Sequence, residues 1–382
     1  MNVGDKKLVL SVLIIQLFAA CIAFIAPILI NSINGPSALA EILYIYSLFV
    51  LSYSFFNFGI PDEIQVWRSK GGDIRYLSKF FALLFFVAIL FLLFSYIVNS
   101  DFSLFFLIIF CFNYVLFESS CRILNQDGSV ILGQILLSLF PMLFWLNSFV
   151  GIVNIEFSLF FISLALTLLS LFFIFKNKKK EDTHSKLIKF SLNGSLKIYV
   201  TRVYASVLDN GPIIFLFHLN LDEHVVIYAL LTRLILPLSM LIQSFNSVLL
   251  RKKIVGDFSL PKLNKNLIAG ILILVSILIT VIYKITNEYL NEFLDIPILA
   301  SLFIFSVAIY RFTIFGFMIQ NSWNIEKINK IKLTILFLLP ILTLAVLLIF
   351  YLFNLPIYIL FIMMVLVILF LIILFGKNYS NI

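Results

Sequence analysis

The sequence predicts an all-α polytopic membrane protein, with about twelve transmembrane helices in two six-helix halves around a central cavity. Three observations support this fold class. The chain of 382 residues is 62% hydrophobic and only 12% charged, with a mean hydropathy of +1.13. Its apolar runs are close to the ~20 residues that a helix needs to cross a bilayer. Its basic residues also cluster in alternate connections between those runs.

The composition excludes a water-soluble domain. A chain with 44 phenylalanines and this hydropathy would expose continuous apolar surface and aggregate in water. The longest polar stretch is about 15 residues, around 176–190, which leaves no room for a separate soluble domain. The apolar run 8–30 is too long for the core of a cleaved signal peptide, so we interpret it as the first membrane span.

Apolar runs predict the order of the helices along the chain. Residues 1–177 form the predicted N-terminal half, 178–190 a basic cytoplasmic linker, and 191–382 the C-terminal half. The expected spans of the first half are 8–31, 38–59, 80–98, 102–123, 129–152 and 156–175. Those of the second half are 192–219, 225–249, 266–285, 296–320, 331–353 and 356–376.

Basic residues predict the orientation. Of the 27 lysines and arginines, 22 lie in, or at the edge of, the segment before the first span and the connections that follow even-numbered spans. The alternate connections hold only Lys284, and several of them are acidic. Because cytoplasmic loops of membrane proteins are enriched in Lys and Arg, both termini are expected in the cytoplasm. The same bias explains the pI of 9.2 without a nucleic-acid partner.

The two halves begin alike. In each, a long span with scattered polar residues leads to a short outer turn, then to an apolar run containing tyrosine and a basic cytoplasmic loop. Two halves with equal span number and the same orientation indicate a parallel repeat. Transporters built in this way hold their substrate between the halves.

Four cations remain inside the predicted spans: Lys197, Arg202, Arg233 and Arg311. An arginine at the centre of a span costs ~3 kcal/mol, so it usually faces a wet cavity or a partner. Arg202 and Arg233 lie deepest, whereas Lys197 is near enough to the cytoplasmic edge for its side chain to reach water. Together they predict a cation-lined cavity for an anionic substrate.

Two anions lie at depth. Asp209 shares a helical face with Arg202, and would neutralise it or take up a proton. Glu118 lies four residues before Arg122, so a local ion pair is expected there. Asp209 and Glu118 are therefore the candidates for ion coupling or charge balance.

A hinge is predicted in the seventh span at Gly211 and Pro212. Pro212 cannot donate a hydrogen bond to the carbonyl of Leu208, so a kink or break is expected. Broken helices near mid-membrane are frequent in transporters. A kink that serves only packing is the alternative.

The sequence predicts no catalytic residue, metal or cofactor. No phosphate-binding glycine loop is present, which argues against ATP hydrolysis. The cysteines lie in apolar runs without paired spacing and are expected to pack as small apolar residues: Cys21, Cys111 and Cys121. The histidines do not cluster for a metal, although the last two could titrate in an outer vestibule: His184, His218 and His224.

Two segments carry a resemblance to a known family. They are "FFNFGIPDEIQVWRSKGG", where Gly59 and Pro61 lead into a basic cytoplasmic loop, and "YASVLDNGPIIFLFHLNLDEHVVIYALLTRLILPL" at the start of the second half. With the twelve-span plan, they resemble the polysaccharide flippases of the multidrug/oligosaccharidyl-lipid/polysaccharide exporter superfamily, which include O-antigen and oligosaccharide-lipid transporters.

The resemblance implies a function. Such a protein would flip an undecaprenyl-diphosphate-linked sugar repeat unit across the bacterial inner membrane for O-antigen or capsule synthesis, driven by a proton or sodium gradient. Its cationic lumen would contact the diphosphate, with Arg202, Arg233 and Arg311 in that role by position and charge. The expected partners are the lipid-linked oligosaccharide and membrane lipids, with no nucleic acid, and the expected state is a monomer.

Three alternatives remain open. An ion-coupled multidrug or small-molecule exporter would need carboxylates in the cavity of the first half, where the first span offers only Gln16. A membrane-embedded polysaccharide polymerase would need a large outer loop, or paired carboxylates at the water interface. The outer acidic residues Glu288, Glu292 and Asp295 have helical spacing without Arg or His companions. A major-facilitator transporter would show a glycine-rich Asp-Arg loop after the second span, which "GIPDEIQVWRSKGG" lacks.

Overall fold

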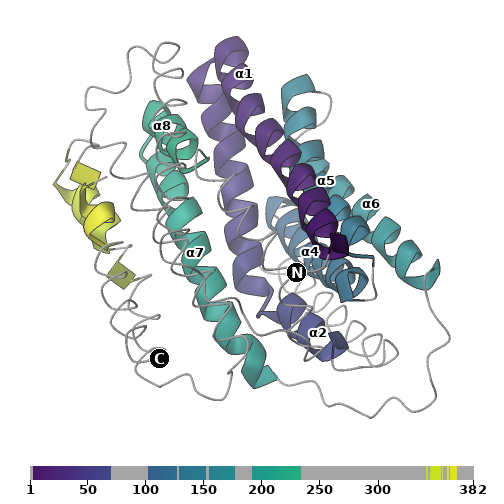
Figure 1. The fold of residues 1–382 in the computed structure, drawn as a ribbon. Coiled ribbons are helices and arrows are strands. Elements are labelled where there is room, and N and C mark those ends of the chain that lie inside the picture. The colour runs from purple at the N-terminus through teal and green to yellow at the C-terminus, as the bar shows by residue number, and fades with distance from the viewer. Residues whose placement is uncertain are drawn as a thin grey trace.

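The computed structural model is helical throughout the elements that it describes (Figure 1). It describes residues 3–69, 102–126, 129–151, 155–176 and 192–233, with short stretches between 341 and 367. Within this part, four helices are long and apolar enough to cross a membrane, at 10–56, 107–125, 130–150 and 157–176. The predicted spans at 80–98, 266–285 and 296–320 lie outside it.

Helix α1 (Val3–Phe56) folds back on itself at Gly35. Gly35 has φ 84° and ψ 172°, a conformation that disfavours any side chain, and Pro36 then starts the second arm with φ already suited to a helix. Figure 1 shows the two arms of α1 side by side. The arms, residues 3–34 and 36–56, correspond to the first two predicted spans and confirm them.

A tight turn ends α1. Phe58 and Gly59 both have positive φ, 46° and 70°, and the side chain of Asn57 accepts a hydrogen bond from the Gly59 N–H at 2.8 Å. A bulky residue at positive φ is uncommon, and the ring of Phe58, although 45% exposed, stacks on that of Tyr199. The turn redirects the chain into a short helix.

That helix, α2 (Ile60–Ser69), corrects the prediction of a loop after the second span. Asp62 and Glu63 lie in its first turn and Arg68 in its last, which complements the helix dipole at both ends. Its balance of polar and apolar residues suits a helix at the membrane edge, below the arms of α1 in Figure 1.

Helices α4 (Phe102–Gln126), α5 (Val130–Val150) and α6 (Ile155–Lys176) match three predicted spans and confirm them. Polar side chains join α4 to α6. The Asn113 amide donates to the Ser163 hydroxyl at 3.1 Å, and the Thr167 hydroxyl donates to the Asn113 carbonyl at 3.2 Å. Such bonds hold helices together in a membrane, where apolar contact alone gives little preference for protein over lipid.

Helices α4 and α5 approach closely at Gly133. A Cβ atom on this glycine would lie 2.3 Å from Oδ1 of Asn125 and 2.7 Å from the carbonyl oxygen of Cys121. Only a glycine allows this approach without a shift of the neighbouring helix.

Helix α7 (Leu192–His218) lies antiparallel to the second arm of α1. At one end Tyr44 stacks on Phe217 with ring centroids 4.3 Å apart, and at the other Phe58 stacks on Tyr199 at 5.4 Å. Helix α8 (Asp222–Arg233) packs against both α1 and α7. The starts of the two predicted halves are therefore in contact along the length of this arm.

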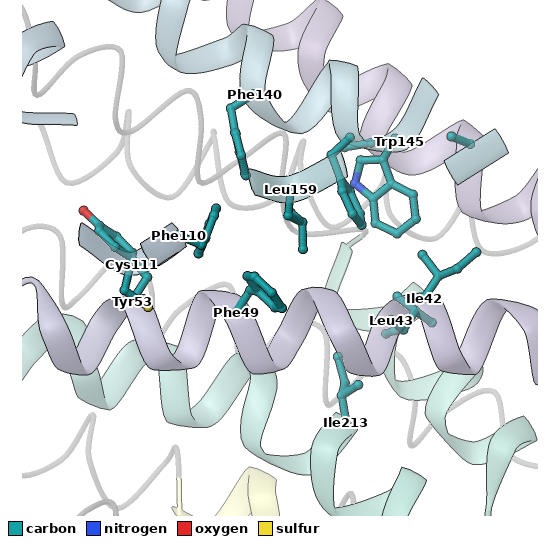
Figure 2. Close-up of a cluster of buried hydrophobic side chains, with 14 of the residues drawn as sticks. Ile42, Leu43, Phe49, Tyr53, Phe110, Cys111, Phe140, Trp145, Leu159 and Ile213 are labelled. Carbon is teal, nitrogen blue, oxygen red and sulfur yellow. The ribbon is translucent and has the colours of Figure 1, made fainter. Parts of the chain in front are cut away.

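The core lies around the second arm of α1 (Figure 2). Phe49 packs edge-on against Phe110 of α4 at 4.9 Å, and Ile213 of α7 approaches the arm from the other side. On α5 and α6, by contrast, many large apolar side chains are exposed, among them Leu146, Phe161 and Phe172. Apolar residues both inside and outside the bundle are what a lipid environment requires.

Candidate functional site

The most unusual buried group in the described part is the guanidinium of Arg233, in α8. Arg233 is only 9% exposed. Its central carbon lies over the indole face of Trp145, 4.1 Å from the ring centroid. Trp145 belongs to α5 and is 1% exposed. A cation over a desolvated tryptophan gains about 2 kcal/mol, which offsets part of the cost of burying the charge.

Two further aromatic rings support Trp145. Phe144 meets it edge-on at 5.1 Å, and Tyr46 of α1 lies 5.7 Å from it between ring centroids. Tyr46 also contacts Phe144 at 4.8 Å. We call Arg233, Trp145, Phe144 and Tyr46 the arginine–aromatic cluster. It joins α1 and α5 of the predicted first half to α8 of the second.

The arginine–aromatic cluster contains a buried donor that no described residue satisfies. The Nη1 atom of Arg233 is buried and has no hydrogen-bond partner among the described residues. An indole face offers no lone pair, so contact with Trp145 satisfies the charge but not the N–H donors. A buried donor without a partner is costly, and such groups often mark a place where a ligand or water completes the site.

A second charged cluster lies where α2 meets α4. The predicted ion pair between Glu118 and Arg122 is confirmed, with Arg122 Nη2 2.9 Å from Glu118 Oε1. The Tyr53 hydroxyl of α1 donates to the other oxygen of Glu118. This buried carboxylate is therefore held from two sides.

Arg122 also reaches α2. Its Nη1 donates to the side-chain oxygen of Gln65 at 3.2 Å, and its Nη2 lies 3.7 Å from Asp62. One guanidinium thus serves acceptors on two helices, with the planar multidonor geometry that arginine supplies. The arrangement fits the predicted charge balance at Glu118, whereas the coupling role stays a prediction.

Polar side chains lie in the middle of helix α7, where the shared face of Asp209 and Arg202 stays a prediction. Asn210 donates to the Ser206 carbonyl at 3.1 Å and both are buried, while Asp209 is half-buried. The helix runs without interruption through Gly211 and Pro212, so the chain does not break there. The hinge at these two residues stays a prediction.

The other predicted cations are less fully described. Lys197 and Arg202 lie within α7, but their side chains are outside the described part of the structure. Arg311 is outside the described residues altogether. Of the four predicted substrate-binding cations, Arg233 alone has a described side-chain environment.

Gln16 forms a hydrogen bond that the sequence did not predict. Its amide donates to the side-chain oxygen of Gln134 on α5 at 2.7 Å, and both side chains are buried. The bond joins the first arm of α1 to α5, which is the role expected of polar side chains between membrane helices.

Sequence reasoning missed Trp145 and Tyr46 of the arginine–aromatic cluster, and Tyr53, Asp62 and Gln65 around Arg122. Aromatic residues are so numerous in this chain that no single one stands out. Asp62 and Gln65 stand three residues apart, which places them on one face of a helix. That spacing could have indicated α2 and a shared partner.

Comparison with known proteins gives likenesses in structure and none in sequence. No protein-family model matches the sequence, and no curated protein matches it significantly. Among solved structures, the chain is similar to a multidrug resistance MATE family transporter of the MOP superfamily in an outward-facing conformation. The TM-score is 0.62 at 14% sequence identity, over 97% of this chain and 93% of that chain.

This likeness establishes the fold. With the apolar helices described above, it makes the chain an all-α, multi-pass membrane protein. The count of twelve spans, the boundary between the halves and the cytoplasmic position of both termini stay predictions. The solved structure belongs to a transporter superfamily, and its description names multidrug resistance.

Proposed function

We propose that the protein is a transporter that flips an undecaprenyl-diphosphate-linked oligosaccharide repeat unit across the bacterial inner membrane for O-antigen or capsule synthesis. The observation that carries the proposal is the buried guanidinium of Arg233, which lies between helices of the two predicted halves. No carboxylate among the described residues pairs with it. A buried cation that no described carboxylate neutralises suits an anionic substrate.

The chemistry of the substrate agrees with a buried cation in a bundle whose outer face is apolar. A diphosphate between sugar and lipid tail would contact the cations, while the tail stays in the bilayer. In this proposal Arg233, Arg202, Arg311 and Lys197 bind the diphosphate or acidic sugars, and Asp209 or Glu118 couples transport to protons or sodium. Gly211 and Pro212 serve as the hinge for alternating access of the two halves.

The test uses cells that lack the gene, rescued with the wild type, Arg233→Gln or Arg202→Gln. Surface polysaccharide is measured together with single lipid-linked repeat units on the cytoplasmic face. Flipping requires that the deletion strands units inside, and that the variants fail to rescue at normal membrane levels. Lys176→Gln removes an exposed charge at the end of α6 and is the matched control, which should rescue fully.

Two other results would redirect the proposal. Single units on the outer face would indicate a polymerase or a later enzyme. Unchanged polysaccharide would favour an ion-coupled exporter of drugs or other small molecules. That second candidate draws on the description of the similar solved structure as a multidrug resistance transporter, and on the buried carboxylate of Glu118 in the predicted first half.

A further inference from the structure

We propose that Arg233 and Trp145 form an anion-binding site shared by the two predicted halves, in which Trp145 holds the guanidinium so that its N–H donors bind an oxyanion of the transported molecule. The proposal rests on the proposed function and deepens it. It makes Trp145, which contacts no substrate in this scheme, a positioning residue for Arg233.

The contact with Trp145 fixes the guanidinium without using up its donors. The Cζ atom lies over the ring face at 4.1 Å, and the ring attracts the charge through its π electrons. An indole face has no lone pair that could accept a hydrogen bond from the guanidinium, so the contact does not occupy its N–H donors as a carboxylate would. Nη1, buried and without a partner among the described residues, is such a donor.

The rings beneath Arg233 pack closely against one another. Trp145 and Phe144 are almost fully buried, and Tyr46 closes the cluster from α1. An arginine side chain on its own samples many rotamers and loses that freedom when it binds. Because the rings already restrict it, less entropy is lost when an anion binds, which increases affinity.

The charge of the site selects an oxyanion over an organic cation. The described contacts of Arg233 are aromatic, and no described carboxylate neutralises it. A second cation brought beside a buried guanidinium would meet uncompensated repulsion. A phosphate or carboxylate oxygen would instead form a short, charge-assisted hydrogen bond to Nη1, which has no partner among the described residues.

The test measures binding of labelled farnesyl diphosphate to the purified full chain in discs of zwitterionic phosphatidylcholine. Farnesol, which has the same tail without the charge, and dodecyltrimethylammonium are the competitors. We expect the diphosphate to bind saturably and neither competitor to displace it. Arg233→Gln should weaken binding at least tenfold, and Arg233→Lys, which keeps the charge but loses the planar set of donors, by a few fold.

Trp145 is tested with a pair of variants. Trp145→Leu should weaken binding by roughly five- to thirtyfold, since the face contact is lost, whereas Trp145→Phe should restore most of the affinity. If Trp145 served only in packing, both variants would bind the diphosphate as tightly as the wild type, provided that thermal unfolding shows them to be equally folded. Tryptophan fluorescence reports on the surroundings of Trp145 directly. The contribution of Trp145 is the difference in emission between the wild type and Trp145→Phe, and its wavelength should shift when the diphosphate binds.

The outcomes separate this proposal from the proposed function. Equal affinity of the wild type, Arg233→Gln and Trp145→Leu for the diphosphate would overturn the shared site, even if cells still strand repeat units. Displacement by dodecyltrimethylammonium would overturn the selection for anions. If the affinities of the Arg233 and Trp145 variants fall as expected, the site is supported. This holds even if deletion of the gene leaves surface polysaccharide unchanged, in which case the transported anion is a different one. Should Arg233→Gln fail to fold, Arg233→Lys and the Trp145 pair carry the test.

Discussion

Arg122 holds together three helices through its own contacts and those of its partner. Its guanidinium binds Glu118 on its own helix and reaches Gln65 and Asp62 on α2, while Tyr53 of α1 secures the far oxygen of Glu118. Breaking a buried pair on one side leaves the other charge uncompensated. The stability of this end of the bundle should therefore depend on both partners together.

A double-mutant cycle tests that dependence. Arg122→Gln should lower the free energy of unfolding by about 3 kcal/mol, because it removes the cation that the buried Glu118 carboxylate faces. Glu118→Gln should cost less, since an amide can still accept the Tyr53 hydrogen bond. The double variant should lose less than the sum of the two. Unfolding by sodium dodecyl sulfate in mixed micelles measures each step, and strictly additive losses would contradict the coupling.

His224, in the first turn of α8, should make stability depend on pH. Burial lowers its pKa below the ordinary 6.5, and the neighbouring Glu223 offsets part of this effect. As the pH falls through 6.5, the unfolded chain takes up this proton before the folded one does. The contribution of the neutral imidazole to stability is therefore complete above that pH and is lost progressively as the pH falls through the lower pKa of the folded state. The wild type should therefore melt earlier at pH 5 than at pH 7.5. His224→Gln should reduce that difference, and an unchanged difference would contradict the assignment.

At the scale of elements, the contact between α4 and α5 depends on Gly133. Gly133→Ala should lower the free energy of unfolding by about 1–3 kcal/mol, because the new methyl group would overlap Asn125 and the backbone of Cys121. Gly211→Ala is the matched control, since its Cβ would meet only Val207 at an ordinary 3.6 Å. Thermal unfolding of the two proteins in the same detergent compares them. Equal losses would show that α4 can shift freely.

The sequence predicted the long helices well and the short one not at all. Spans at 102–123, 129–152 and 156–175 coincide with α4, α5 and α6, because the width of a bilayer sets the length of an apolar run. Helix α2 has mixed polarity and only ten residues, so hydropathy gave no signal for it. Its evidence was local: a glycine and a proline before two acidic residues, which is typical of a helix start.

Across the whole molecule, the second arm of α1 and α7 touch at both ends. Tyr44 and Phe217 meet at the predicted outer end, and Phe58 and Tyr199 at the predicted cytoplasmic end. Phe58 also sits in a turn with an unfavourable positive φ. If the two halves separate alternately on each side of the membrane, each aromatic pair must part in one of the two states.

Cross-linking tests this requirement. In a chain with Cys21, Cys111 and Cys121 replaced by alanine, cysteine pairs are placed at 44 and 217, or at 58 and 199, and joined with a short bis-maleimide. Each cross-link should abolish transport, whereas the same proteins without the reagent should keep most of it. A control pair within the first half, at 113 and 163, should tolerate its cross-link. Full transport with both aromatic ends joined would contradict alternating separation here.

The candidate site was predictable in its charge and not in its surroundings. Arg233 stood out because an arginine is rare at membrane depth. Its aromatic neighbours come from positions 46 and 145, nearly a hundred residues apart, and no local pattern links them. The same limit applies to Arg122: the partner four residues away followed from helix geometry, but the partners on α2 did not. Contacts between distant segments depend on packing that a single chain does not reveal.

The position of Trp145 before Arg233 in the chain bears on how the protein is made. A ribosome delivers α5 to the membrane well before α8, so the indole is already in place when the guanidinium leaves the translocon. Without the contact to Trp145, an arginine deep in a span raises the free energy of insertion by ~2.5–3.5 kcal/mol. Residues 191–382 synthesised alone should therefore insert α8 inefficiently, which a glycosylation tag in the following loop would report. Co-expression of residues 1–190 should restore insertion, so that the early part of the chain acts as an intramolecular chaperone for the later one.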